Sequence, residues 1–208
     1  MLLRSVVSRG DNRGPRCAAC RLDERRCLCA LLPRLETRTR LVLVLHRDEA
    51  HKPTNTGQLA ARCIINSEVL VRGRPGEPVP RFCADAATQP LLLFPHDDAL
   101  PLAAFAASAR PVTLIVPDGT WRQAARVSHR LPGLEGVPRV ALPPEAPSGY
   151  RVRAGAHAER VPTLEAIARA FGVLEGAAVR EALERLHRAL VERTLAARGT
   201  LGTLRRAG

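Results

Sequence analysis

Four cysteines stand close together near the N-terminus, in the pattern Cys-x2-Cys-x6-Cys-x-Cys, at Cys17, Cys20, Cys27 and Cys29. Four thiolates can close a tetrahedral Zn²⁺ site with no open coordination position, which is typical of a structural metal site. We therefore expect a structural zinc, with an iron–sulfur cluster or unliganded thiols as the alternatives. The remaining two, Cys63 and Cys83, have no partner spacing and are expected to be buried as small hydrophobic residues.

A second group of candidate residues follows the apolar run at residues 112–116 and consists of Pro117, Asp118, Gly119, Thr120 and Trp121. This pattern indicates a strand that runs into a turn and then a helix, and ligands of open α/β sheets bind at the carboxyl ends of strands. Thr120 and the glutamine three residues later form a capping box, which accounts only for the start of a helix. It does not account for the chain's only tryptophan at the first helical position, so we expect a ligand crevice there.

Arginines recur at every fourth position of the same predicted helix, at Arg122, Arg126 and Arg130. Like charges at this spacing repel each other mildly, and an anionic partner would offset the repulsion. An ordinary solvated helix face is the alternative interpretation.

The composition also favours an anionic partner. The 208 residues include 32 Lys and Arg against 20 Asp and Glu, a formal net charge of +12, and Lys52 is the only lysine. Arginine pairs with phosphate through two hydrogen bonds, and binding to a polyanion releases counterions. A high-GC coding bias explains the preference for arginine over lysine but not the net charge. Because 46% of the residues are apolar, disorder throughout is excluded.

Several classes of protein are not expected. The longest apolar stretch, residues 99–109, is shorter than the ~20 residues that a membrane span needs, and it contains Pro101. The first fourteen residues have no apolar core of a secretory signal, so we expect a cytoplasmic protein without a membrane span. The motifs of P-loop NTPases, dinucleotide-binding proteins, zinc proteases and α/β-hydrolases are missing from the sequence.

Strand-like and helix-like segments alternate along the chain. Short apolar runs predict strands at residues 40–46, 68–72, 91–94, 112–116 and 139–142. Amphipathic or apolar stretches predict helices at residues 56–65, 99–109, 120–131, 163–174 and 177–197. The alternation predicts an α/β fold with a mainly parallel sheet and helices on both faces. We expect a flexible N-terminus at residues 1–14, a zinc-binding module at 15–36 and the α/β domain at 37–208.

These segments, in this order, resemble the DTW-domain family, named for the residues that stand here as Asp118, Thr120 and Trp121. The resemblance extends to the cysteines and to residues 54–57, 93–95, 150–153 and 163–166. It implies a SPOUT-like fold with a C-terminal trefoil knot. It also implies a tRNA-uridine aminocarboxypropyltransferase, which moves the 3-amino-3-carboxypropyl group of S-adenosylmethionine to N3 of a tRNA uridine and releases 5′-methylthioadenosine. A SPOUT-type RNA methyltransferase that uses S-adenosylmethionine and a non-catalytic zinc-knuckle RNA-binding protein are the alternatives.

The resemblance also implies roles for individual residues. Asp118, Thr120 and Trp121 would be catalytic, with Asp118 as general base or as ligand of the donor's ammonium group. The donor would be held by Leu93, Phe94, Pro95, Pro117, Asp118, Gly119, Arg153, Thr163 and Glu165. The RNA would be held by Asn55, Thr56, Arg122, Arg126, Arg130 and Arg151. The partner is tRNA, and no obligate protein partner is expected. One departure from the family pattern is Pro162, where we expect a serine.

Overall fold

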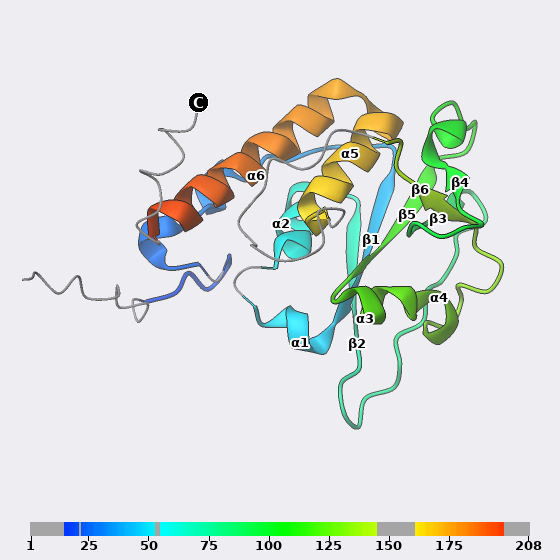
Figure 1. The fold of residues 1–208 in the computed structure, drawn as a ribbon, viewed down its shortest axis with the longest axis horizontal. Coiled ribbons are helices and arrows are strands. Elements are labelled where there is room, and N and C mark those ends of the chain that lie inside the picture. Colours follow the sequence, from blue (N-terminus) through cyan, green and yellow to red (C-terminus); the bar gives the residue numbers. More distant parts are fainter. Residues whose placement is uncertain (1–14, 21, 53–54, 145–160, 198–208) are drawn as a thin grey trace, which may run out of the picture.

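A six-stranded sheet forms the centre of the protein. The computed structural model describes residues 15–20, 22–52, 55–144 and 161–197 (Figure 1). The described strands are β1 (Arg40–His46), β2 (Ser67–Arg72), β3 (Gln89–Leu93), β4 (Leu100–Pro101), β5 (Val112–Asp118) and β6 (Arg139–Ala141). Their order is β2-β1-β5-β3-β6-β4, and every pair runs parallel. The prediction of a mainly parallel sheet is confirmed.

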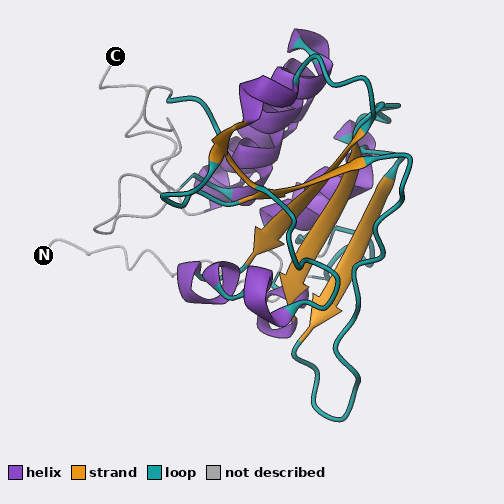
Figure 2. Ribbon diagram, turned by 90° about the vertical axis from the view of Figure 1, so that its right-hand side faces the viewer, coloured by secondary structure: helices purple, strands orange, loops and turns teal. Residues whose placement is uncertain are grey.

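Helices of very different length accompany the sheet. They are α1 (Arg47–Ala50), α2 (Thr56–Cys63), α3 (Trp121–Ala125), α4 (Val127–Arg130), α5 (Thr163–Glu175) and α6 (Ala177–Ala197). Figure 2 shows the long helices along the sheet and short helices near the carboxyl ends of the strands. In the described ranges, no helix is both long enough and apolar enough to span a membrane.

Both faces of the sheet are covered. Leu41 and Leu43 of β1 belong to a core that includes side chains of α2, α5 and α6, among them Phe171. Val42 and Val44 of the same strand belong to a second core, with side chains of α4 and of neighbouring loops. Burial on both faces explains why β1 is a continuous apolar run rather than an alternating one. The predicted α/β sandwich with helices on both faces is therefore confirmed.

Two of the predicted helices differ from the structure. Residues 99–109 form β4 and a short 3-10 helix, Leu102–Phe105, instead of an α-helix. Pro101 has no N–H to donate, and Leu102 is the only fully buried side chain of that short helix, so an amphipathic face is lacking. The helix predicted at residues 120–131 is interrupted at Arg126, which ends α3 and precedes α4.

The cysteine segment packs against the main core. Leu28 is fully buried there, in the same cluster as side chains of β1 and α5, and Arg193 of α6 donates a hydrogen bond to the carbonyl of Cys27. The division of the chain at residue 36 stays a prediction. The prediction of a flexible N-terminus concerns residues 1–14, which lie outside the described residues. The trefoil knot also stays a prediction, because residues 145–160 lie outside them too.

Cys63 and Cys83, the two cysteines outside the N-terminal cluster, differ in their burial. Cys63 is buried, and its thiol hydrogen-bonds the carbonyl of Leu59 at 3.2 Å, as α2 allows for residues four apart. The expectation of a buried residue is therefore confirmed for Cys63. Cys83 is exposed, so the same expectation is wrong for that residue. It lies in the stretch between β2 and β3, which has no helix or strand and consists mostly of exposed residues.

Leu28→Ala tests whether the cysteine segment is part of the main core. We expect the free energy of unfolding to fall by about 2–5 kcal/mol, because a fully buried leucine leaves a cavity. Leu31→Ala is the matched control, since Leu31 is 47% exposed in the same segment and should change stability by less than about 0.5 kcal/mol. Chemical denaturation monitored by circular dichroism measures both. Equal stability of Leu28→Ala and the wild type would show that the segment folds separately.

Candidate active site and metal centre

The carboxylate of Asp118 joins three segments that are far apart in the sequence. It lies at the end of β5 and is 8% exposed. Its Oδ2 accepts a hydrogen bond from Asn55 Nδ2 at 2.7 Å, and its Oδ1 accepts one from Thr163 Oγ1 at 2.8 Å. The start of α2 and the start of α5 are thereby held at the carboxyl edge of the sheet. Three of the predicted segments thus lie together.

The beginning of α2 is shaped to approach this carboxylate. Asn55 caps the helix, because its Oδ1 accepts a hydrogen bond from the N–H of Gln58 at 2.9 Å. Gly57 follows, and a Cβ at that position would lie only 2.4 Å from Asp118 Oδ2. The neighbouring Thr56 accepts a hydrogen bond from the N–H of Leu164 at 3.3 Å. The two helix starts therefore contact each other as well as Asp118.

The first turn of α5 also contributes to this junction. Pro162 precedes the helix and offers no side-chain cap, as expected for a residue without a hydroxyl. The hydroxyl of Thr163 is directed to Asp118 instead. Glu165, the other predicted donor-binding residue of this turn, pairs with Arg169 of the same helix at 2.6 Å.

Burial raises the pKa of Asp118, and the hydrogen bonds from Thr163 and Asn55 offset part of this rise. The negative charge of Glu49 raises the pKa of Asp118 further. Sequence reasoning did not assign Glu49 a role. The signal that could have found it is its position three residues after β1, where it reaches the same edge of the sheet. Its carboxylate pairs with Lys52 at 2.5 Å.

Two aromatic rings meet beside Asp118. Trp121 and Phe94 lie with their ring centroids 4.8 Å apart, and the rings are tilted by 36°. Phe94 is buried at the end of β3, whereas Trp121 is 48% exposed at the start of α3. The capping box is confirmed, because the side chains of Thr120 and Gln123 each accept a hydrogen bond from the other's backbone N–H. The turns after β3 and β5 therefore lie together, and about half of the Trp121 surface remains accessible.

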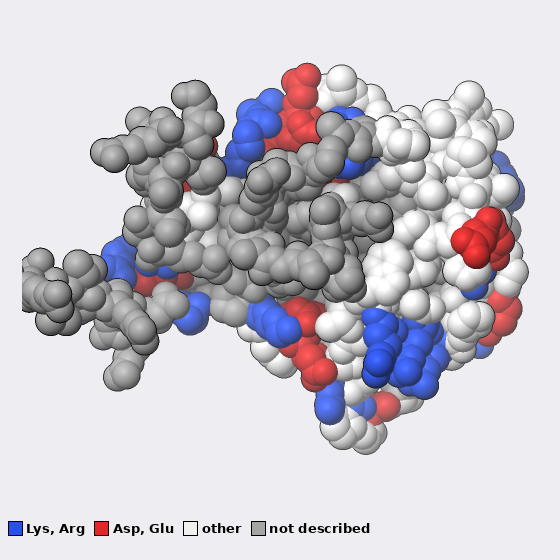
Figure 3. Space-filling model, viewed as in Figure 1, with Lys and Arg blue, Asp and Glu red and all other residues white. Residues whose placement is uncertain are grey.

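The predicted arginines fall into two groups. Arg122, Arg126 and Arg130 are exposed on α3 and α4, and Figure 3 shows Lys and Arg side chains gathered over this region. Arg151 and Arg153 lie outside the described residues, and their roles stay predictions. Sequence reasoning missed Arg72, which is buried at the end of β2 and bonded to the carbonyl of Gln123 on α3. A cation directly after the apolar run at residues 69–71 was the available signal.

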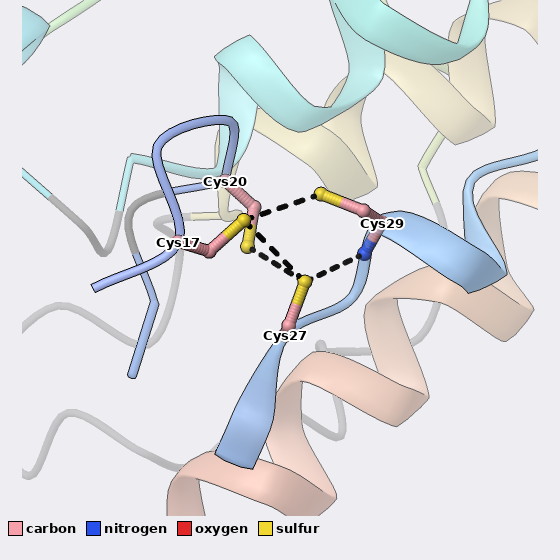
Figure 4. Close-up of side chains that lie close together, drawn as sticks. All are labelled: Cys17, Cys20, Cys27 and Cys29. Carbon is pink, nitrogen blue, oxygen red and sulfur yellow. Dashed lines mark hydrogen bonds between the residues drawn. The ribbon is translucent and has the colours of Figure 1, made fainter. Parts of the chain in front are cut away.

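The four clustered cysteines have the geometry of a tetrahedral metal site (Figure 4). Their sulfur atoms all lie within 4.8 Å of one another, with separations of 3.5 Å for Cys17–Cys27 and 3.7 Å for Cys17–Cys29 and Cys20–Cys27. A Zn–S bond of ~2.3 Å requires sulfurs about 3.8 Å apart in a tetrahedron. Hydrogen bonds from the backbone of Cys20 and Ala19 lower the pKa of Cys17 to about 6, whereas burial and the neighbouring thiols raise the pKa of Cys29 to about 12. The cluster could therefore hold a zinc ion.

The sequence is similar to those of known proteins. A family model described as the DTW domain matches residues 14–195. Proteins named tRNA-uridine aminocarboxypropyltransferase 2 are similar to the chain: that of Macaca fascicularis is 31% identical over 173 residues, that of Drosophila melanogaster 29% over 171, and that of Mus musculus 30% over 173. These alignments cover 78%, 79% and 78% of this chain and 57%, 68% and 57% of those proteins. The chain thus matches little more than half of the macaque and mouse relatives. No solved structure matches.

Gly57→Ala tests the close approach of α2 to Asp118. Glycine to alanine in a helix normally stabilises by about 1 kcal/mol, but here we expect a loss of about 1–3 kcal/mol from overpacking against Asp118. Gly172→Ala on α5 is the comparison: its Cβ would lie 2.7 Å from Cδ of the partly exposed Arg180, which can shift, so we expect a smaller loss than at Gly57. Thermal unfolding measures both, and Asp118→Ala in the Gly57→Ala background should remove the clash. Stabilisation by Gly57→Ala alone would contradict the observed contact.

Cys20→Ser tests the metal centre. We expect about one zinc per chain in the wild type, and loss of that zinc together with a lower unfolding temperature in the variant, because metal binding contributes to folding. Cys83→Ser is the control, since Cys83 is exposed and remote in sequence from the cluster. Elemental analysis by mass spectrometry measures the metal. Iron with the absorption of a cluster, or no metal in the wild type, would contradict a zinc site.

Proposed function

Because this chain belongs to the DTW-domain family, we propose that it modifies tRNA by moving the 3-amino-3-carboxypropyl group of S-adenosylmethionine to N3 of a uridine. The names of the relatives supply the group and the acceptor. The observation that carries the proposal is the junction at Asp118, which gathers the family's segments at one edge of the sheet. The donor, the N3 atom and the by-product are what the resemblance to the family implies, and they are part of the proposal.

We propose that the donor binds between the turns after β3 and β5, which lie together at the contact of Phe94 with Trp121. Backbone groups of residues 93–95 and 117–119 would hold its adenosine, since ligands of parallel sheets bind beyond the carboxyl ends of strands. The exposed face of Trp121 would stack on the adenine or on the target base. Arg153 would pair with the donor carboxylate or with an RNA phosphate, and Thr163 and Glu165 would complete the site.

The reaction is a substitution at the carbon that joins the aminocarboxypropyl group to sulfur. The lone pair of uridine N3 forms the new C–N bond while the C–S bond breaks. The electron pair of that bond goes to sulfur, and 5′-methylthioadenosine leaves. The sulfonium carries three carbons, so the product depends on which carbon lies in line with N3. Positioning of the donor therefore determines which group is transferred.

We propose that the proton of N3 goes to the carboxylate of Asp118. A carboxylate whose pKa is raised by burial accepts a proton more readily. The hydrogen bonds from Asn55 and Thr163 would hold it in a fixed orientation. The other role for Asp118 is an ion pair with the donor's ammonium group, which would change the KM for the donor more than kcat.

The target uridine must be unpaired or turned out of the RNA helix, because N3 lies on the Watson–Crick edge of the base. We propose that the exposed arginines at positions 122, 126 and 130 and the zinc-binding module at residues 15–36 hold the rest of the tRNA. The net charge of +12 supports this role. A zinc ion held by the four cysteines would fix the fold of that module and take no part in the transfer.

Incubation of the protein with unmodified tRNA and S-adenosylmethionine tests the reaction. We expect one uridine per target tRNA to gain the mass of an aminocarboxypropyl group, measured by mass spectrometry of the digested nucleosides. Asp118→Asn should lower the rate by about 10²–10⁴-fold while tRNA affinity stays unchanged. Asp85→Asn, in an exposed loop, is the control with the same chemical change.

The other outcomes each reject a part of the proposal. A methyl increment together with S-adenosylhomocysteine would identify a methyltransferase. Binding of tRNA without any modification would identify a non-catalytic RNA-binding protein. An Asp118→Asn variant with full kcat would exclude the role of general base. An unchanged kcat with a raised KM for S-adenosylmethionine would assign Asp118 to the donor's ammonium group.

A further inference from the structure

Arg72 is a buried cation whose hydrogen bonds are incomplete. It is 8% exposed at the end of β2, and its Nη2 donates to the carbonyl of Gln123 at 2.5 Å. This bond has a structural explanation, because a cation near the last turn of α3 satisfies a carbonyl that the helix leaves free. The same explanation does not cover Nε, which is buried and has no partner among the described residues. A buried donor without an acceptor requires a further explanation.

The surroundings of Arg72 are positively charged. Burial lowers the pKa of Arg72, and the charges of Arg130 and Arg126 lower it further. Within the described ranges, no carboxylate forms an ion pair with Arg72. Other arginines of the protein do have such partners, among them Arg40, Arg74, Arg139, Arg169 and Arg180. The described carboxylates therefore do not offset the repulsion among Arg72, Arg126 and Arg130, and an anion from outside the protein would do so.

The position of these three arginines is beside the candidate active site. Arg126 and Arg130 are exposed on the helices that begin at Trp121, and Arg72 reaches α3 from the end of β2. On the face shown in Figure 3, Lys and Arg side chains gather over the region of α3. An anion bound here would thus be anchored on the same short helices that carry the exposed tryptophan.

We propose that Arg72, Arg126 and Arg130 form a binding site for one backbone phosphate of an RNA that places a base at Trp121. The phosphate supplies both the negative charge and the acceptor oxygens that the guanidinium groups lack, and arginine binds it through paired hydrogen bonds. An acidic protein segment would also supply charge, but a base stacked on an aromatic ring next to a bound phosphate is the combination that single-stranded RNA offers. That this RNA is the substrate tRNA rests on the proposed function.

Binding of an unmodified tRNA transcript at several salt concentrations, without S-adenosylmethionine, tests the site. Arg72→Gln and Arg126→Gln should each weaken binding, and the slope of log K against log salt should become shallower, by up to about 0.7–0.9 for loss of the phosphate contact. Arg74→Gln is the matched control: it removes the same charge two residues further on, where the exposed arginine is paired with Glu77. It should leave affinity and slope close to those of the wild type.

Two further variants separate phosphate binding from folding. Arg72→Lys keeps the charge but loses the paired donors, so we expect weaker binding with the salt slope of the wild type. Circular dichroism and the unfolding temperature check that this variant folds. In the Arg72→Gln, Arg126→Gln double variant, the fold loss in affinity should differ at least about twofold from the product of the single losses, because both side chains bind one phosphate.

Three results would overturn the proposal: equal effects of Arg72→Gln and Arg74→Gln, wild-type affinity of Arg72→Lys, or losses that multiply in the double variant. Displacement of the tRNA by polyglutamate as readily as by a single-stranded RNA of equal charge would assign the site to an acidic protein instead. The binding measurement needs no group transfer. Failure of the proposed reaction would therefore leave this result intact, and failure of the phosphate site would leave the reaction intact.

Discussion

The buried carboxylate of Asp118 is the constraint on which the arrangement of the site depends. A carboxylate away from water needs hydrogen-bond donors, and the side chains of Asn55 and Thr163 provide two of them, beside the backbone of Gly119. Because these donors stand at the starts of α2 and α5, satisfying one charge fixes two helices against the end of β5. The glycine at position 57 is needed for the same reason, since any side chain there would collide with Asp118.

The arrangement of the sheet converts this local constraint into a site. β5 lies between β1 and β3, so the turns after all three strands meet at one edge, and each brings polar or aromatic groups there. Phe94 follows β3 and contacts Trp121, which stands three residues after Asp118 and is 48% exposed. Exposed arginines then continue along α3 and α4. The proposed donor site thus adjoins the exposed arginines that are proposed to hold the RNA backbone.

Features with local causes could be predicted from the sequence, and features with long-range causes could not. The strand β1, the capping box at Thr120 and the cysteine cluster depend on neighbouring residues and are confirmed. The helix expected at residues 99–109 is wrong, because apolar composition without an amphipathic face cannot hold a helix on the sheet. The bonds of Asp118 span 63 and 45 residues, and only the folded chain reveals them. Burial of Arg72 and exposure of Cys83 are likewise set by tertiary packing.

We infer that the hydrogen bonds to Asp118 shape a binding site beside Trp121. Trp121 is the chain's only tryptophan, so its fluorescence reports on this site alone. This inference is tested by titrating S-adenosylmethionine into the wild type and into Thr163→Val. The variant loses one hydrogen bond to Asp118. We expect a saturable change of Trp121 emission in the wild type. In the variant, the Kd for S-adenosylmethionine should be at least about tenfold higher, as expected when a hydrogen bond to a charged group is lost. An emission that does not respond to the donor, or equal Kd values, would contradict it.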